Sequence, residues 1–277
     1  MGSSLVSVVV PSFNQSEYLP VALDSVMFQD YPNLEIIICN HGSTDDTSDV
    51  ISDFIKRVGT EKVRYLDKTN EALDGLEFVR SEKLRYSQGR HLKVIESREN
   101  IGGTASYNEG FRAATGKYCT YLVGDDYLQS NAISEMVQVL ETGRVDFVYA
   151  DMFVVDDRGQ ILQKLSKPDY SFDRCFCDWF HLGVCRLYRR SLHDASGYYN
   201  PDYRNANDYD MYLRFAMDGC RFEHIPKVLY YTRKHDSENP DEPASWCSEG
   251  YNNLLRESFK CASRARAFAE NRAEVEV

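Results

Sequence analysis

The chain has 277 residues, of which 32 are Lys or Arg and 43 are Asp or Glu, so its formal net charge is −11. A chain this acidic is poorly suited to sequence-independent nucleic-acid binding, which requires a basic surface. The longest run of hydrophobic residues is four, far short of the roughly 18 that span a bilayer. The first residues show no secretory signal, and 43% hydrophobic content is ample for a folded core.

The eight cysteines are scattered, and several lie inside apolar runs. This pattern is typical of small buried side chains in a reducing compartment and not of a disulfide framework. We therefore predict a cytoplasmic protein. Cys175, Cys177, His181 and Cys185 can be grouped as zinc ligands, but no CxxC pair is present, so the zinc interpretation is not favoured.

The first 150 residues alternate between strand-like and helix-like segments. Apolar runs predict strands over 5–10, 34–39, 63–66, 92–95, 118–123 and 147–150. Helical spacing of apolar residues predicts helices over 17–29, 50–58, 104–115 and 131–142. Near-continuous apolar strands that alternate with helices indicate an α/β fold. We expect a Rossmann-like, mostly parallel mixed sheet that is flanked by helices.

The alternation of strand-like and helix-like segments is interrupted between Asp67 and His91, in a charged stretch with one weak apolar stripe. We predict an insertion over 67–91, as a loop or a short helix at the sheet edge. Further along, the pattern predicts a helix over 208–217, a strand over 228–232 and a closing amphipathic helix over 248–270. The predicted organisation is one α/β domain over 1–240, followed by a C-terminal helical extension over 241–277.

Parallel α/β sheets bind ligands at the carboxyl ends of their strands, so the residues that directly follow each strand are informative. These residues are Pro11-Ser12-Phe13-Asn14, Asn40-His41-Gly42-Ser43-Thr44-Asp45 and Gly124-Asp125-Asp126. Neither G-x-G-x-x-G nor G-x-x-x-x-G-K-[ST] occurs in the chain. Dinucleotide-binding and P-loop functions therefore lose their main sequence support.

Asp125 and Asp126 follow a predicted buried strand. Two adjacent carboxylates repel each other, and a cation offsets that cost. Carboxylates suit Mg²⁺ or Mn²⁺, which bridge them to substrate phosphates. The alternative is a solvated turn that caps the helix beginning near Asn131, because Asp favours caps and turns. Taken alone, the pair fits the turn better.

Asp208 and Asp210 open a predicted helix. Either residue can cap the helix and complement its dipole, or a carboxylate that faces the cleft can act as a general base. His235 alone is more often a surface histidine than a ligand. An aromatic segment can stack on a sugar or cover the sheet; its members are Tyr170, Phe172, Phe176, Trp179 and Phe180.

Several segments follow one another in a recognisable order. They are Val8-Val9-Val10-Pro11-Ser12-Phe13-Asn14, the segment from Leu34 to Thr47, Asn100-Ile101-Gly102-Gly103 through Asn108-Glu109-Gly110, Tyr121-Leu122-Val123-Gly124-Asp125-Asp126, Asp208-Tyr209-Asp210 and Tyr230-Tyr231-Thr232-Arg233-Lys234-His235. In this order and spacing they resemble the inverting family 2 glycosyltransferases of the GT-A fold. The resemblance runs from about Leu5 to His235, which is most of the chain.

The resemblance implies a nucleotide-diphosphate-sugar donor, with the ring of Phe13 beside the base. The donor-binding residues it implies are Pro11, Ser12, Phe13, Asn14, Asn40, His41 and Asp125. Asp126 and His235 are the implied ligands of Mn²⁺ or Mg²⁺, and Asp208 is the implied base that deprotonates the acceptor. The implied acceptor is a glycan or a lipid-linked saccharide, and no nucleic-acid partner is expected. Peripheral membrane contact and a homodimer both stay open.

The chain departs from the family pattern at the second strand exit. The family usually has Asp-Asp where this chain has Asn40-His41. A neutral His41 can accept a hydrogen bond from a nucleobase, but histidine titrates near neutrality. Val123 and Gly124 also replace an earlier Asp-x pair. The alternative function is therefore a catalytically silent homologue that binds a nucleotide sugar or a glycan. A nucleotidyltransferase is less favoured, because the chain lacks its Gly-rich, Arg/Lys-bearing phosphate loop.

Overall fold

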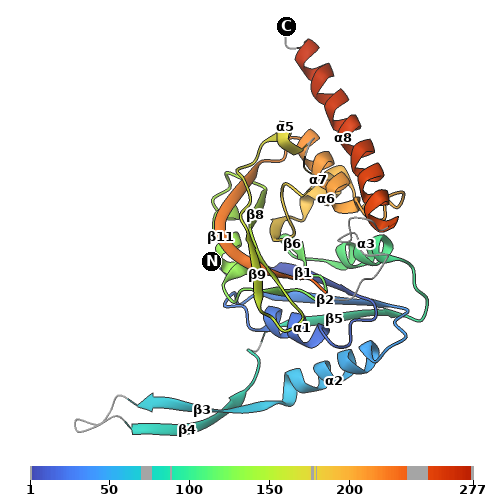
Figure 1. The fold of residues 1–277 in the computed structure, drawn as a ribbon. Coiled ribbons are helices and arrows are strands. Elements are labelled where there is room, and N and C mark those ends of the chain that lie inside the picture. The colour runs from blue at the N-terminus through green and yellow to red at the C-terminus, as the bar shows by residue number, and fades with distance from the viewer. Residues whose placement is uncertain are drawn as a thin grey trace.

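The structure is a computed structural model, and it describes residues 2–69, 77–87, 89–175, 178, 180–235 and 249–275. Within these residues the fold centres on a nine-stranded mixed sheet of order β5-β2-β1-β6-β10-β8-β11-β7, with β9 beside β8 (Figure 1). Its strands are β1 (Val6–Ser12), β2 (Leu34–His41), β5 (His91–Ser97), β6 (Tyr118–Tyr121), β7 (Tyr127–Leu128), β8 (Phe147–Val155), β9 (Ile161–Leu165), β10 (Arg186–Arg189) and β11 (Phe222–Arg233). The helices are α1 (Leu19–Met27), α2 (Thr47–Thr60), α3 (Gly103–Ala113), α4 (Ala132–Leu140), α5 (Phe172–Cys175), α6 (Ser191–Ser196), α7 (Asn207–Met217) and α8 (Glu249–Val275). The predicted α/β class is confirmed.

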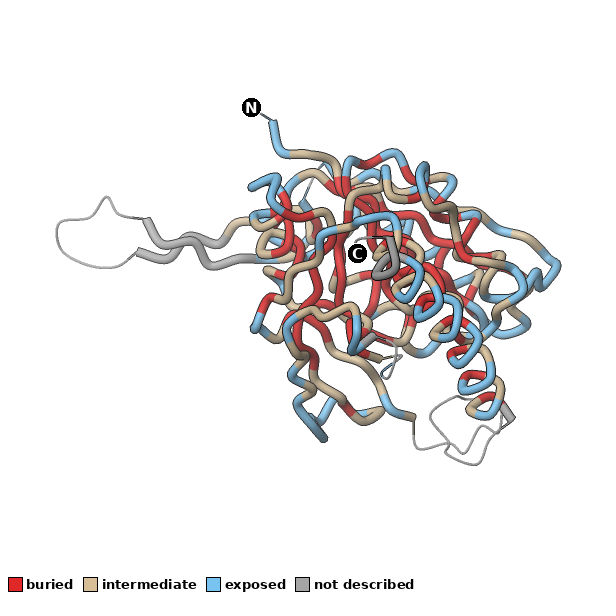
Figure 2. The backbone as a smooth tube through the Cα atoms, turned by 90° about the horizontal axis from the view of Figure 1, so that it is seen from above, coloured by how far each residue is buried: buried red, intermediate tan, exposed pale blue. Residues whose placement is uncertain are grey.

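One half of the sheet is parallel. Strands β5, β2, β1 and β6 run in the same direction, and every residue of β1 is buried. Successive side chains of β1 pack on opposite faces of the sheet: Val8 belongs to the hydrophobic core on one face, and Val9 to the core on the other. Figure 2 shows the buried backbone gathered in these central strands. Because both faces are covered, the strands are apolar throughout. Their carboxyl ends meet at one edge, where Ser12 pairs with Asn40.

The other half of the sheet is mixed. β10 runs antiparallel to both β6 and β8, and β11 runs parallel to β8. The short strands β7 and β9 pair antiparallel with β11 and β8. The sequence did not predict β10, which is only four residues long. The mixed half matters for the site because β10 leads into α6 and then α7, which carries Asp208.

Helix α3 lies unusually close to the sheet. A Cβ atom on Gly110 would stand 2.2 Å from Cγ1 of Val9 and 3.0 Å from Sγ of Cys39. Only glycine therefore allows this approach. As a result, the preceding turns of α3 lie against the end of β2, where His41 stands.

The segment after α2 differs from the prediction. β3 (Lys62–Thr69) and β4 (Glu77–Leu84) form a separate two-stranded antiparallel sheet, in full register from Lys62–Leu84 to Thr69–Glu77. Strand 63–66 is thus not part of the central sheet, and 77–84 is a strand instead of a loop or short helix. The hairpin projects from the body beyond α2 (Figure 1). Residues 70–76 and 88 lie outside the described residues.

The closing helix predicted over 248–270 is α8. Its Leu254, Cys261 and Ala265 pack against Ala206, Tyr209 and Leu213 of the α7 region. α8 then continues beyond the body of the molecule (Figure 1). Whether 241–277 forms a unit distinct from 1–240 stays a prediction.

The aromatic segment and the cysteines have mainly packing roles where they are described. Tyr170 stacks on Phe222 at 4.3 Å between ring centroids, while Phe176, Cys177 and Trp179 lie outside the described residues. Cys39, Cys119, Cys185 and Cys261 are free and buried, as predicted, and burial raises the pKa of Cys39, Cys119 and Cys185 to about 12. Among the described residues, no helix is long and apolar enough to cross a membrane.

Candidate functional site

The strand exits of β1 and β2 border a pocket of about 310 Å³. Its lining includes four of the residues predicted to bind a donor, Pro11, Ser12, Phe13 and His41. The ring of Phe13 is 46% exposed, which leaves an aromatic face available to a ligand. The Oγ atom of Ser12 is buried and has no hydrogen-bond partner among the described residues. A hydroxyl in this state is available to a bound group.

Asn14 and Asn40 shape the pocket rather than line it. Asn14 has a positive φ of 52°, and its side-chain Oδ1 accepts a hydrogen bond from the backbone N–H of Thr44 at 2.8 Å. Asn40 is buried, donates from Nδ2 to Ser48 and Glu96, and accepts from Ser43. Asn14 therefore holds the two exit turns together, whereas Asn40 ties the β2 exit to α2 and β5.

His41 is buried, and both of its ring nitrogens have partners on α3. Nδ1 lies 2.8 Å from Oγ of Ser106, and Nε2 lies 2.9 Å from a carboxylate oxygen of Glu109. A hydrogen bond from a nucleobase to His41 would thus require one of these contacts to break. The proposed base-accepting role of His41 stays a prediction.

Asp126 is engaged by the protein on both oxygens. Tyr230 donates its hydroxyl to Oδ2 and Arg233 its backbone N–H to Oδ1, each at 2.7 Å. The residue is 5% exposed, and burial, with the charge of Asp125, raises its pKa to about 8. These contacts fix the end of β11 against the β6 exit. The metal-binding role predicted for Asp126 from the sequence would require a cation to compete with these contacts, and it stays a prediction.

Asp125 and His235 form a partly buried pair beside the ends of β6 and β11. Oδ2 of Asp125 lies 2.9 Å from Nε2 of His235, and Nδ1 of the same ring lies 2.7 Å from Asp157. The hydrogen bond to Asp125 is the main cause that raises the pKa of His235 to about 9; burial opposes it and Asp157 adds to it.

The second oxygen of Asp125, Oδ1, is buried without a hydrogen-bond partner among the described residues. An orphaned carboxylate oxygen beside an imidazole fits a divalent cation that takes its other ligands from substrate phosphates. Within the described ranges, no group of three or more His, Cys, Asp or Glu residues has metal-site geometry. Both ring nitrogens of His235 already have carboxylate partners, so the metal site predicted from the sequence at Asp126 and His235 stays a prediction.

Asp208 stands at the start of α7, as predicted, and is 28% exposed. Its Oδ1 accepts from the backbone N–H of Tyr209 at 2.7 Å. Its Oδ2 lies 3.3 Å from the hydroxyl of Tyr121 and 3.4 Å from Nη1 of Arg186. The side chain is held from several elements yet still reaches solvent. Asp210, in contrast, has no exposed side-chain surface and pairs with Arg214 and Arg264.

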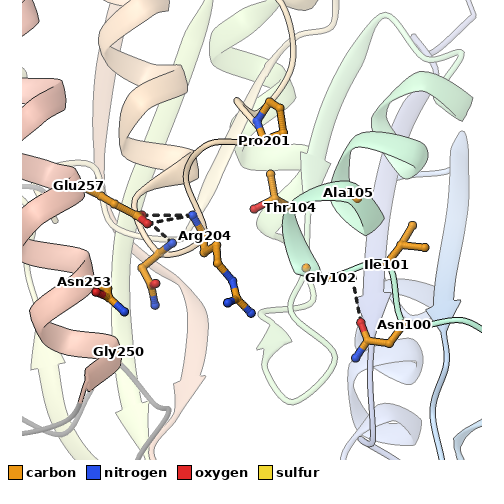
Figure 3. Close-up of a pocket in the computed structure, with 12 residues that line it drawn as sticks. Asn100, Ile101, Gly102, Thr104, Ala105, Pro201, Arg204, Gly250, Asn253 and Glu257 are labelled. Atoms are coloured by element: carbon orange, nitrogen blue, oxygen red, sulfur yellow. Dashed lines mark hydrogen bonds between the residues drawn. The ribbon is translucent and has the colours of Figure 1, made fainter.

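A larger cavity of about 990 Å³ opens beside the strand-exit pocket, between α3, the 201–205 loop and α8. Asn100, Gly102, Gly103 and Arg204 line both spaces, so the two are continuous. Figure 3 shows Glu257 of α8 reaching the 204–206 backbone. One of its oxygens accepts the N–H groups of Asn205 and Ala206 at 2.8 Å, which fixes the loop that leads into α7.

Sequence reasoning missed Arg186, Arg204 and Glu257. Arg186 carried a usable signal, because it interrupts the apolar run Val184-Cys185-Arg186-Leu187-Tyr188. A charge within a buried strand requires a partner. Arg204 and Glu257 carried no such signal in the sequence, since their closeness to each other depends on how α8 packs against the loop before α7.

Comparison with known proteins gives consistent matches. The chain is 26% identical over 247 residues to an uncharacterised glycosyltransferase of Rickettsia prowazekii, covering 85% of this chain and 66% of that protein. It is 25% identical over 264 residues to the chondroitin synthase of Escherichia coli, covering 92% of this chain but only 32% of the synthase. It is 24% identical over 234 residues to the Escherichia coli enzyme WfaP, covering 83% and 78%.

Solved structures share the fold. Staphylococcus aureus TarS 1–349 in complex with UDP-GlcNAc superposes with a TM-score of 0.65 at 20% identity, covering 91% of this chain and 65% of that one. The mannosyltransferase PcManGT from Pyrobaculum calidifontis, in complex with GDP-Man and Mn²⁺, gives 0.60 at 15% identity, covering 98% and 76%. The family model described as glycosyl transferase family 2 matches residues 7–75 and 74–197. With the α/β sheet and the strand-exit site, these matches place the chain in glycosyltransferase family 2, with a GT-A fold.

Proposed function

We propose that the chain transfers a sugar from a nucleoside-diphosphate-sugar donor to an acceptor hydroxyl, in one displacement with inversion. The observation that carries this proposal is the position of Asp208, a partly exposed carboxylate close to the strand-exit pocket. Tyr107 lines that pocket. Its ring packs edge-on against the ring of Tyr121, at 4.9 Å between centroids, and the hydroxyl of Tyr121 lies 3.3 Å from Oδ2 of Asp208. One aromatic side chain therefore separates Asp208 from the lining of the pocket.

The chemistry assigns one task to Asp208. The acceptor oxygen attacks the anomeric carbon while the bond from that carbon to the diphosphate breaks, and the hydroxyl proton passes to the carboxylate. Attack opposite the leaving group inverts the configuration. Asp208 needs only to reach that proton. A divalent cation, when bound, supplies charge that stabilises the departing diphosphate, and Asp125 and His235 are the residues that would hold it.

We assign the nucleoside to the 310 Å³ pocket and the acceptor to the adjoining cavity. The cavity is lined by amide, hydroxyl and backbone groups, which suit a glycan. TarS was solved with UDP-GlcNAc, and WfaP is named as acting from UDP-Glc on a diphosphoundecaprenol-linked GlcNAc. A UDP-sugar and a glycan or lipid-linked acceptor are thus the first substrates to test, and we place the reaction in the cytoplasm.

The test begins with donor binding. UDP, GDP, CDP and dTDP are each added with Mn²⁺ or with EDTA, and the melting temperature is measured. A ligand that binds only the folded state raises it. We expect one nucleotide to stabilise the protein, and more so with Mn²⁺. No stabilisation by any of them would refute the donor site.

The second step tests Asp208. Asp208→Asn removes the basic oxygen, so we expect transfer to fall by about 10²–10⁴-fold with nucleotide affinity retained. Asp202→Asn is the matched control, since this exposed residue lies on the loop before α7. A wild-type rate in Asp208→Asn would remove Asp208 as base. Nucleotide binding without turnover by the wild type would favour the catalytically silent alternative.

A further inference from the structure

Arg186 is a cation buried in the middle of the central sheet. It lies on β10, and its side chain has no exposed surface. The guanidinium stands between the rings of Tyr121 and Tyr212, at 4.5 Å and 4.7 Å from their centroids. Its Nε donates to the carbonyl of Val184 at 3.0 Å. The guanidinium is thus held by contacts with two rings and one hydrogen bond.

The carboxylate that balances this charge is Asp208. Its Oδ2 lies 3.4 Å from Nη1, and within the described part of the chain it is the only carboxylate within 4 Å of Arg186. Nη2 is buried with no hydrogen-bond partner among the described residues, so the guanidinium is only partly satisfied. A buried charge that loses its partner is costly. Arg186 therefore depends on Asp208 being ionised.

Among the described residues, no other group around Asp208 supplies a charge that could balance Arg186. The hydroxyl of Tyr121 from β6 lies near Oδ2 of Asp208, and the charge of Asp208 contributes to the raised pKa of Tyr107 from α3 and of Tyr199 from the loop before α7. Burial raises the pKa of all three phenols, so they stay neutral at ordinary pH. Asp125 is the next charged neighbour of Tyr107, and it carries the same negative sign as Asp208. Among the residues that the structure describes, Arg186 is the cation that pairs with Asp208.

We propose that Arg186 is the positioning residue of the reaction, which holds one oxygen of Asp208 in place at the start of α7. The proposal rests on the role of Asp208 proposed above. The contact with Arg186 restricts where the carboxylate can lie, and a base acts only when it lies within reach of the proton that it takes.

A purely structural Arg186 would behave differently. Its loss would lower the melting temperature and leave the kcat of the folded protein unchanged. The loss of a positioning Arg186 would lower kcat while the KM for the donor stays the same, because donor binding does not need the base. The split between kcat and KM therefore separates the two roles.

The experiment follows the release of UDP from UDP-glucose and UDP-N-acetylglucosamine, with water as acceptor. In Arg186→Met we expect kcat to fall at least about tenfold and KM to stay within about twofold. Arg186→Lys keeps a cation beside Asp208 but not the planar fork of donors, so its kcat should recover only part of the way. Arg189→Met is the matched control: it lies on the same strand but pairs with Asp146.

A wild-type kcat in folded Arg186→Met would overturn the proposal, and so would an equal loss of kcat in Arg189→Met. If Arg186→Met does not fold, Arg186→Lys decides: the proposal requires a loss of kcat at an unchanged KM, and a wild-type kcat would refute it. A wild type that binds UDP and releases none from either donor would refute the proposed function itself, and this proposal with it.

Discussion

Asp210 offers a stability test of how α8 is attached. Its carboxylate has no exposed surface and accepts from Nε of Arg214 at 2.8 Å and from Nη2 of Arg264. Arg214 continues α7, whereas Arg264 comes from α8. The two arginines therefore share one buried negative charge, and Asp210→Asn removes that charge while keeping the shape.

The expected cost follows from the burial of each partner. Removing one member of a buried ion pair costs about 3–5 kcal/mol. Arg264 is 43% exposed, so it can regain water, and the amide introduced by Asp210→Asn still accepts one hydrogen bond. We therefore expect a loss of about 2–4 kcal/mol. At about 2–3 °C per kcal/mol for a chain of this size, the melting temperature should fall by about 5–10 °C.

The assay is thermal unfolding, with urea unfolding as a second measure. Asp210→Asn/Arg264→Met is the informative double variant, because removing the α8 cation as well relieves the unbalanced charge. Its loss should be smaller than the sum of the two single losses, as is usual for residues in contact. A melting temperature within about 2 °C of the wild type for Asp210→Asn would refute the reasoning. Strict additivity would show that the two residues do not act together.

Three further predictions follow from the site. Asp125→Asn should abolish the gain in UDP affinity that Mn²⁺ gives, whereas Asp126→Asn should keep it, as calorimetry with Mn²⁺ and with EDTA can show; the reverse result would restore Asp126 as ligand. His41→Asp should place a carboxylate against Glu109, so we expect a lower melting temperature with no loss of uridine-nucleotide binding; weaker binding would place His41 in direct contact with the base. Burial lowers the pKa of His193 to about 4, below the unfolded value of about 6.5. The stability it contributes is therefore complete above about pH 6.5 and lost as the pH falls towards 4, so His193→Gln should flatten the acid side of a urea-midpoint profile.

The parallel half of the fold could be predicted well from the sequence, because the burial of each of its strands shows in the residues of that strand alone. Strands such as 34–39 are covered on both faces, so burial appears as an unbroken apolar run. The hairpin β3–β4 left no such signal, since Glu77–Leu84 mixes charged and apolar residues without a regular period. β10 was missed because it is short and carries the charged Arg186 at its start.

The site residues likewise divide into those that a local sequence pattern reveals and those that depend on contacts between distant segments. Asp125, Asp126, His235 and Asp208 could be found in the sequence from their positions after strands or at a helix start. Which aspartate faces the opening could not be found, because Asp126 is turned inward by Tyr230 and Arg233, more than a hundred residues away. Likewise, the contact between Arg186 and Asp208 depends on β10 and α7 meeting across the sheet.

The hairpin β3–β4 has a consequence for handling the protein at high concentration. Within the described residues it pairs with no other strand, so its outer edges present unpaired backbone groups that can recruit another chain. Lys62 and Arg64 stand on one strand, and Glu82 and Lys83 on the other. Charges at this density oppose edge-to-edge association. Replacing them with neutral residues in order to simplify the surface should therefore lower the solubility of the protein while leaving the distant sheet and its pocket intact.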